Sequence, residues 1–211
     1  MTGVQTCALT ISIINTGSPF FYKEIKKIKK YNQKIKIIDV QFNDYGHIKE
    51  HFDNYKDIDI TIVESKAMKK FLIKKGELKN KIEIIPNGTN LSMFNKSIKL
   101  ANEINRKKFD IDKNKFIVSF LGRLSEEKKP DTIIEIAKKL EKHKDILIVI
   151  AGDGPLKSDL ENLIKLKKIE NVKILGHQNP IDIISISDIN ILTSVIDGSP
   201  MTIKECMECG V

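Results

Sequence analysis

Apolar residues in the second half of the chain form short, nearly uninterrupted runs separated by amphipathic stretches. Residues 116–121 (FIVSFL) and 146–151 (ILIVIA) are typical of parallel strands that are covered on both faces. Two further strands are predicted at 172–175 and 189–193. Helices are predicted between and after the strands: 130–142, from the turn at 152–155 to Lys167, 180–185 and from 201 onward. This βαβ alternation with short loops requires a parallel sheet with right-handed crossovers.

The first half of the chain shows the same alternation less clearly. Ser18 and Pro19 open a helix in which Phe21, Ile25 and Ile28 recur at helical spacing. The remaining predicted elements are strands at 34–42, 57–63 and 82–85 and helices at 48–55, 65–75 and 98–109. We therefore predict fold class α/β with two doubly wound, Rossmann-like domains. The expected boundaries are 12–90 for the first domain, 91–114 for a linker with a connecting helix, and 115–211 for the second domain.

The first eleven residues (MTGVQTCALTI) do not fit the pattern that follows. They carry no charge and lack both the positive start and the apolar core of a signal peptide. They look like the translation of a sequencing-library adapter, so we interpret residues 1–11 as an artefact and leave them out of the fold. We expect the chain to be a fragment at both ends.

Charge is unevenly distributed along the chain. The formal net charge is +8, with 22 basic and 13 acidic residues before Lys115 and 14 basic and 15 acidic residues from Lys115 on. A basic first half suits an anionic membrane surface, although a solvated lysine-rich surface would look the same. Only Arg106 and Arg123 are arginines, so a nucleic-acid partner is not expected. No apolar run is long enough for a spanning helix, and we expect a cytoplasmic protein, or one peripheral on the inner face of the membrane.

The loops at the carboxyl ends of the predicted strands hold the candidate chemistry. Parallel α/β sheets bind ligands at that edge, and we expect four loops to share it: 122–129, 152–155, 176–180 and 194–200. In the first loop, Arg123 and Lys128 are two cations suited to a diphosphate, and Gly122 lets the backbone approach closely. Each feature also has a plainer interpretation, because loop lysines are commonly solvated and glycines are commonly turn residues.

Two carboxylates follow in the last of these loops and the helix after it. Asp197 lies in the loop and Glu205 lies eight residues later in the helix, where they could accept hydrogen bonds from hydroxyl groups. The free amides at the start of that helix suit an anion or sugar oxygens. Cations, amides and carboxylates at one edge together fit a nucleotide that carries a sugar.

Histidine and cysteine add little to this picture. His47 and His51 are four apart on one helix, but no third zinc ligand is evident, so no metal is expected. His177 follows Gly176 at the carboxyl edge and could line a base pocket. Cys206 and Cys209 form one C-x2-C pair, which is better explained by helix packing than by zinc or redox chemistry.

Five segments, in order, resemble motifs of the retaining glycosyltransferases of family 4, which have the two-domain GT-B fold. The resemblance runs from about Lys34 to Val211 and is strongest after Ile82. The five segments are IIPNGTNLSMF (84–94), FLGRLSEEKKPD (120–131), AGDGPLKSDLENL (151–163), VKILGH (172–177) and DGSPMTIKECMECG (197–210). In this family the N-terminal domain starts earlier and the C-terminal domain continues further, so both domains here would be incomplete.

The resemblance implies a role for each matching residue. Arg123 and Lys128 would hold the donor diphosphate and stabilise the leaving group without a metal. Glu205 would bind ribose hydroxyls, and Asp197 would contact the transferred sugar. The other donor-binding positions would be Gly122, Gly152, Gly154, His177, Gly198, Ser199, Pro200, Met201 and Thr202. The acceptor side would include Asn43, Asp44 and His47.

The implied reaction transfers a sugar from a nucleotide diphosphate sugar to the hydroxyl of a glycan or lipid-linked acceptor, with retained configuration and no cofactor. Three departures from the motifs bear on it: Asp197 replaces a Glu, Asn90 replaces an Asp, and Lys129 replaces a Gly, which would change the bend of its loop. Two alternatives stay open. One is a sugar-nucleotide epimerase or sugar phosphorylase of the same fold, and the other is a non-catalytic nucleotide-binding module. This chain alone is expected to show little transferase activity, to expose apolar sheet faces and to aggregate.

Overall fold

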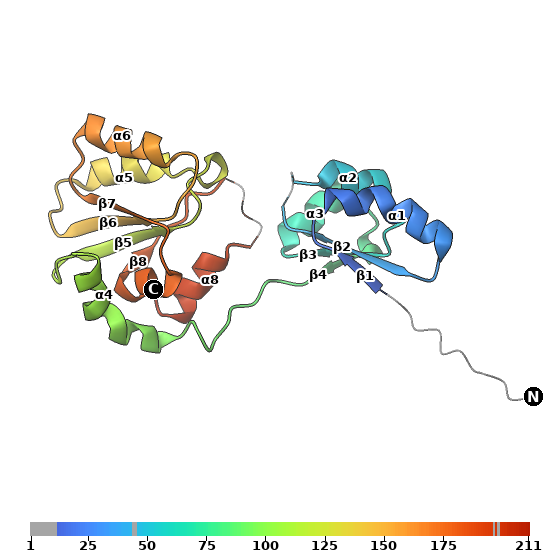
Figure 1. The fold of residues 1–211 in the computed structure, drawn as a ribbon, viewed down its shortest axis with the longest axis horizontal. Coiled ribbons are helices and arrows are strands. Elements are labelled where there is room, and N and C mark those ends of the chain that lie inside the picture. The colour runs from blue at the N-terminus through green and yellow to red at the C-terminus, as the bar shows by residue number, and fades with distance from the viewer. Residues whose placement is uncertain (1–11, 44–45, 196, 198) are drawn as a thin grey trace, which may run out of the picture. The chain divides into compact units, whose positions relative to one another are not determined.

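The structure, a computed structural model, describes residues 12–43, 46–195, 197 and 199–211. These residues form two units that divide between Asn87 and Gly88 (Figure 1). Each unit holds a sheet of four strands, and every strand pair in both sheets is parallel. This confirms the predicted α/β class with two Rossmann-like sheets.

The first unit has the sheet order β1-β2-β3-β4. Its strands are β1 (Ser12–Asn15), β2 (Lys36–Gln41), β3 (Ile60–Val63) and β4 (Ile82–Ile84). Its helices are α1 (Pro19–Tyr31), α2 (Ile48–Asn54) and α3 (Lys66–Lys74), with a 3-10 turn at Lys79–Lys81. Among the described residues of this unit, β1 is the strand that the sequence pattern does not predict, and the 3-10 turn is not predicted either.

All three helices of the first unit cover the same face of its sheet (Figure 1). Ile25 and Ile37 are fully buried between α1 and the sheet, and Leu72 and Ile82 are buried beneath α3. The other face carries a cross-strand row of Ile14, Ile38 and Ile60, in which Ile14 is 61% and Ile60 37% exposed. Parallel sheets are normally covered on both faces, so this face is unusually apolar for a surface.

The second unit has the sheet order β7-β6-β5-β8. Its strands are β5 (Phe116–Leu121), β6 (Ile146–Ala151), β7 (Val172–Gly176) and β8 (Ile189–Asn190). Its helices are α4 (Asn102–Lys108), α5 (Asp131–Leu140), α6 (Lys157–Lys167), α7 (Pro180–Ile186) and α8 (Met201–Glu208), with 3-10 turns at Lys96–Ala101 and Glu126–Lys128. None of the described helices has the length and apolar character needed to cross a bilayer.

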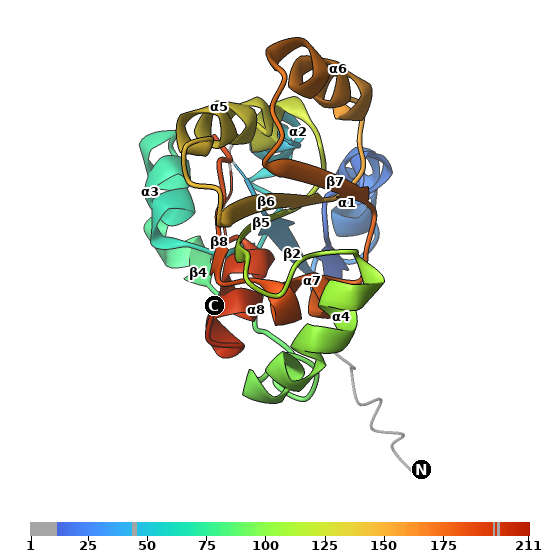
Figure 2. The same ribbon diagram turned by 90° about the vertical axis from the view of Figure 1, so that its left-hand side faces the viewer.

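Helices cover both faces of the second sheet, as its apolar strands predict. Figure 2 shows α5 and α6 on one side and α4, α7 and α8 on the other. Alternate residues of β5 enter the two cores: Phe120 packs on the α5 side, and Ile117 and Leu121 pack on the α7 side. Burial of continuous runs on both faces is the main stabilising contribution here.

Arg106 of α4 connects this helix to the rest of the second unit through hydrogen bonds. Only 7% of the residue is exposed. Its guanidinium donates to the carbonyl oxygens of Asp112 (3.1 Å), Lys115 (2.9 Å) and Ile186 (3.3 Å) and to Oδ1 of Asn102 (2.9 Å). A buried cation is tolerated when its donors are satisfied in this way. One side chain therefore joins α4, the start of β5 and the end of α7.

Arg106→Met should lower the free energy of unfolding by about 2–4 kcal/mol, because three carbonyl groups lose a charged donor. The exposed neighbour Lys107 provides the matched control, and Lys107→Met should change stability by less than about 0.5 kcal/mol. Urea unfolding followed by circular dichroism measures both. Equal effects of the two substitutions would contradict this role of Arg106.

Candidate active site

A pocket of about 310 Å³ lies at the carboxyl edge of the second sheet. The loops after β5, β6 and β7 and the first turn of α8 all contribute to it. Its lining includes five of the residues predicted from sequence, namely Gly122, Arg123, Gly152, His177 and Thr202, together with Leu121, Ala151, Asp153, Gln178 and Pro180. The parallel topology thus brings residues up to eighty positions apart in sequence to one edge, where α/β sheets bind ligands.

Two glycines allow the loops after β5 and β6 to touch through their backbones. A Cβ on Gly152 would lie 1.8 Å from the carbonyl oxygen of Gly122, and a Cβ on Gly154 would lie 2.4 Å from that of Leu124. The N–H of Leu124 donates to the Asp153 carbonyl at 2.9 Å, which fixes this contact. Gly154 does not line this pocket, and its close approach to Leu124 holds the two loops together.

The loop that contains Lys128 is also tied to the loop that contains Asp197. Thr193 donates through Oγ1 to the carbonyl oxygens of Lys128 (2.8 Å) and Lys129 (2.9 Å). Lys128 Nζ and Asp197 Oδ2 form an ion pair at 2.5 Å. Two residues predicted for catalysis are therefore paired with each other. Ser194 Oγ lies 3.4 Å from the same carboxylate oxygen.

Lys129 adopts the backbone conformation that a glycine would favour. Its φ is +47° and its ψ is +52°, in the left-handed region. Lys129, which replaces the Gly of the family motif, thus lies at a left-handed turn of this loop. A non-glycine residue in this conformation costs about 1–2 kcal/mol, which the hydrogen bond from Thr193 to its carbonyl helps to offset.

The start of α8 presents the last group of predicted residues. Pro200 precedes the helix, Met201 and Thr202 form its first turn, and Ser199 Oγ accepts a hydrogen bond from Lys204 Nζ at 2.6 Å. Glu205 lies one turn further, is partly buried, and has its pKa raised by burial. Gly198, also predicted for this site, lies outside the described residues.

Cys206 and Cys209 point away from the site into the core against the second sheet. Both are free and buried. Burial raises the pKa of Cys206 to about 12 and also raises that of Cys209. Thiols that stay protonated at neutral pH are inert, so the expected packing role is confirmed.

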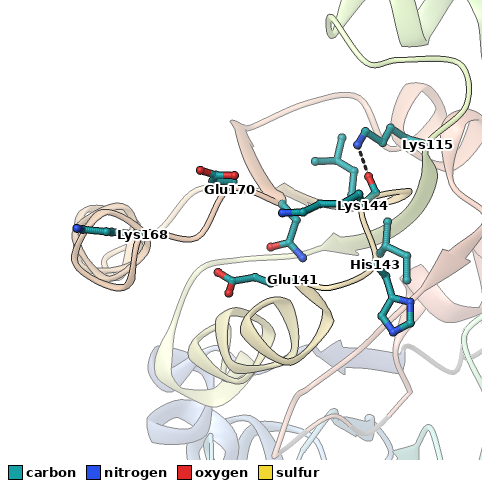
Figure 3. A pocket seen from close by; sticks show the side chains of 9 residues that line it. Lys115, Glu141, His143, Lys144, Lys168 and Glu170 are labelled. Carbon is teal, nitrogen blue, oxygen red and sulfur yellow. Dashed lines mark hydrogen bonds between the residues drawn. The ribbon is translucent and has the colours of Figure 1, made fainter.

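A second pocket of about 430 Å³ lies at the opposite, amino-terminal edge of the same sheet (Figure 3). Its labelled side chains carry both signs of charge: Lys115, Glu141, His143, Lys144, Lys168 and Glu170. None of the residues predicted for the site lines it. The smaller pocket is therefore the better candidate, because it lies at the edge where parallel sheets bind ligands.

In the first unit, the acceptor-side predictions fall at the carboxyl edge of its sheet. Asn43 follows β2, and its Oδ1 accepts from the N–H of Gly46 at 2.9 Å. The ring of His47 packs beside Gly17, in the loop after β1, and lies 6.1 Å from the ring of Tyr22 between centroids. Asp44 lies outside the described residues.

His51 belongs to a buried hydrogen-bonded network that sequence reasoning did not find. Its Nδ1 lies 2.7 Å from Asp39 Oδ2, and its Nε2 lies 2.9 Å from Glu77 Oε2. Thr61 donates to Glu77, while Asp39 also accepts from three further side chains, those of Asn15, Tyr22 and Gln41. Two carboxylates hold the imidazole from opposite sides. Within the described residues no His, Cys, Asp and Glu side chains are grouped as metal ligands.

The pKa of His51 shows that the imidazole is charged at neutral pH. Burial alone would lower the pKa, but hydrogen bonds to Asp39 and Glu77 outweigh that effect and raise it from 6.5 to about 9. The ring is thus an imidazolium that donates from both nitrogens. The network is a structural core of the first unit, because all three side chains are almost completely buried.

The family of the chain is given by a match to the sequence of the second unit. Residues 101–211 match the family described as glycosyl transferases group 1, which is more than half of the chain. The chain belongs to the glycosyl transferases group 1 family. The matched region contains the whole carboxyl-edge pocket and α8.

Curated members of this family are similar over most of the chain. An uncharacterized glycosyltransferase of Methanocaldococcus jannaschii is 35% identical over 158 residues, which cover 72% of this chain and 38% of that protein. The UDP-Gal:alpha-D-GlcNAc-diphosphoundecaprenol alpha-1,3-galactosyltransferase of Escherichia coli is 33% identical over 139 residues, or 62% of this chain and 35% of that protein. The chain therefore matches less than two fifths of the length of these relatives.

Two solved structures, one of them named as a glycosyltransferase, share the fold. The Anabaena protein HepE, crystallised with UDP, superposes with a TM-score of 0.77 at 19% identity, over 95% of this chain and 58% of that one. A glycosyltransferase from Rickettsia africae superposes with a TM-score of 0.67 at 21% identity, over 86% and 58% of the two chains. These matches confirm the GT-B type of fold.

Gly152→Ala should lower the free energy of unfolding by roughly 3 kcal/mol or more, since the new methyl group would overlap a backbone carbonyl that cannot rotate away. Gly88→Ala is the control, because no atom lies within 4 Å of its added Cβ. Thermal and urea unfolding of both variants measure the difference. A stable Gly152→Ala protein would show that the backbone contact is not required.

The stability of the first unit should depend on pH through His51. The folded pKa of about 9 exceeds the value of 6.5 expected for the unfolded chain, so the network's contribution is complete below pH 6.5 and is lost as pH rises through 9. The loss is about 3 kcal/mol. Urea unfolding between pH 6 and pH 10 measures it. The profile of His51→Gln should be flatter over this range, and profiles with equal slopes would contradict the assignment.

Proposed function

We propose that this protein is a retaining glycosyltransferase of family 4, which moves a sugar from a nucleotide diphosphate sugar to an acceptor hydroxyl. The observation that carries the proposal is the carboxyl-edge pocket, where Gly122, Arg123, His177 and Thr202 meet, in a chain of the glycosyl transferases group 1 family. The structural neighbour HepE was crystallised with UDP and glucose, which supports a donor of this class.

Each side chain then has a role that its position supports. Arg123 in the pocket and Lys128 in the same loop would bind the donor diphosphate and stabilise its charge as the sugar leaves. Two fixed cations supply this stabilisation without a metal ion. Asp197 would contact the transferred sugar once it is released from Lys128.

The amides and carboxylate of α8 would complete the donor site. The backbone at Ser199–Thr202 presents the unpaired N–H groups of a helix start, which bind phosphate or sugar oxygens. Glu205, partly buried one turn later, would accept hydrogen bonds from the ribose hydroxyls. His177 would face the base, since it lines the same pocket from the loop after β7.

The acceptor would be a glycan or a lipid-linked glycan, bound by the first unit near Asn43 and His47. Two relatives support a lipid-linked acceptor through their names: the E. coli galactosyltransferase acts on a diphosphoundecaprenol-linked sugar, and a yeast relative, 26% identical over 160 residues, is a phosphatidylinositol N-acetylglucosaminyltransferase subunit. We therefore place the protein in the cytoplasm, with its basic first unit against an anionic membrane surface.

Isothermal titration with UDP tests the donor site directly. The chain should bind UDP, and Arg123→Ala and Lys128→Ala should each weaken binding by about 10- to 100-fold, because each removes one charged contact to the diphosphate. His143→Ala, in the pocket at the other edge of the sheet, is the control and should leave the affinity unchanged.

Absence of UDP binding at millimolar concentration, together with no binding of other nucleoside diphosphates, would overturn the proposal. Incubation with a UDP-sugar distinguishes the reaction types. A transferase releases UDP faster when an acceptor is added, whereas an epimerase converts the donor without any acceptor. The anomeric configuration of the product, read by proton NMR, tests retention.

A further inference from the structure

The outward surface of α1 combines exposed aromatic rings with lysines. The helix buries Tyr22 and Ile25 against its sheet. On the opposite side, Phe20 near its start is 73% exposed and Tyr31 at its end is 90% exposed. Four exposed lysines lie between the two rings: Lys23, Lys26, Lys27 and Lys30. Lysines together with exposed aromatic rings are typical of helices that lie at a membrane surface.

Most of this positive charge is not balanced within the protein. Lys27 pairs with Glu24 at 3.0 Å, but Lys23, Lys26 and Lys30 have no ion-pair partner among the described residues. By contrast, Lys29 on the inner side of the same helix is held by Asp59 at 2.5 Å. Of the five lysines of the helix, Lys29 stabilises the fold, Lys27 pairs with Glu24 at the surface, and the other three have no ion-pair partner among the described residues.

A hollow of about 580 Å³ continues this charge at the C-terminal end of α1. Five lysines line it, with two aspartates: Lys26, Lys29, Lys30, Lys56 and Lys81, and Asp57 and Asp59. Lys81 is engaged, since it donates to the carbonyl oxygens of Tyr55 (3.2 Å) and Ile58 (2.7 Å). The lining of the hollow has an excess of positive charge, and the hollow is large enough to admit a phosphate group.

We propose that this surface, defined by Phe20, Tyr31 and the four lysines between them, docks on an anionic lipid bilayer. Lysines attract lipid phosphates, and aromatic rings partition to the level of the headgroups. Nucleic acid fits less well, because the surface contains no arginine and its two rings lie at opposite ends of the helix. The inference deepens the membrane association included in the proposed function and does not depend on the donor site.

Co-sedimentation of the full chain with phospholipid vesicles tests the proposal. The chain should bind vesicles of phosphatidylcholine mixed with phosphatidylglycerol at low salt, bind weakly to phosphatidylcholine alone, and be released by high salt. The triple substitution Lys23→Gln, Lys26→Gln, Lys30→Gln should lower the partition coefficient about 100-fold, and Phe20→Ser should lower it several-fold.

A charge-matched control distinguishes vesicle binding by this surface from vesicle binding caused by the overall positive charge of the unit. Lys66, Lys70 and Lys74 are exposed on α3, and their replacement by Gln removes the same charge from the same unit. This control should reduce binding far less than the α1 variant. Leu78→Ser, at a side chain that is 55% exposed, is the matching control for Phe20→Ser.

Three results would overturn the proposal: no binding to anionic vesicles at low salt, equal loss of binding in the α1 and α3 triple variants, or tighter binding to duplex DNA than to the vesicles. UDP affinity, measured on the same preparations, should be the same in both triple variants as in the parent chain. Unchanged UDP binding with lost vesicle binding would leave the transferase proposal intact, so the two proposals can fail separately.

Discussion

The candidate site depends on backbone contact between the loops that follow three adjacent strands. The N–H of Gly122 donates to the Ala151 carbonyl at 3.1 Å, and the N–H of Gly152 donates to the Gly176 carbonyl at 2.7 Å. These bonds extend the ladder of the sheet beyond the strands and leave no room for a side chain at Gly152. The positions of Arg123 and His177 follow, because each residue comes directly after one of the bonded glycines. The site is thus held by main-chain atoms, and its side chains are placed on a rigid edge.

The sequence predicts those elements whose own side chains are buried, because burial leaves an apolar pattern within the segment itself. Strands β5 and β6 are recognisable because both of their faces are covered, which makes every position apolar. The shared edge of the loops then follows from parallel topology. Strand β1 was missed because it is four residues long, with only Ile13 and Ile14 as apolar residues, and next to a segment set aside as unrelated. It is a strand because it pairs with β2, and the residue pattern of a short segment does not show which strand it pairs with.

Side-chain partners were less predictable than the backbone. The expectation that His47 and His51 share one helix is wrong, because His47 precedes α2 as its N-cap and only His51 lies on the helix. The spacing also cannot show that His51 turns inward to Asp39 on β2 and to Glu77 after α3. These partners come from elements that meet only in the folded sheet. At Lys129 the changed bend expected from the motif comparison stays a prediction. The backbone there is left-handed, and Thr193 stabilises it by donating to the carbonyl oxygens of Lys128 and Lys129. The roles of the donor-site residues themselves stay predictions.

The ion pair of Lys128 and Asp197 has a consequence for how the site receives an anion. Lys128 is already ordered by a carboxylate at 2.5 Å, so a lysine that would otherwise sample many rotamers would lose little freedom on binding the diphosphate of the proposed donor. Such binding would exchange one anion for another. Occupation of Lys128 by a phosphate and release of the Asp197 carboxylate would be two sides of one equilibrium, coupled by the same free energy in both directions. In the proposed site, a sugar that engages the released carboxylate would therefore strengthen the binding of the diphosphate to which it is attached.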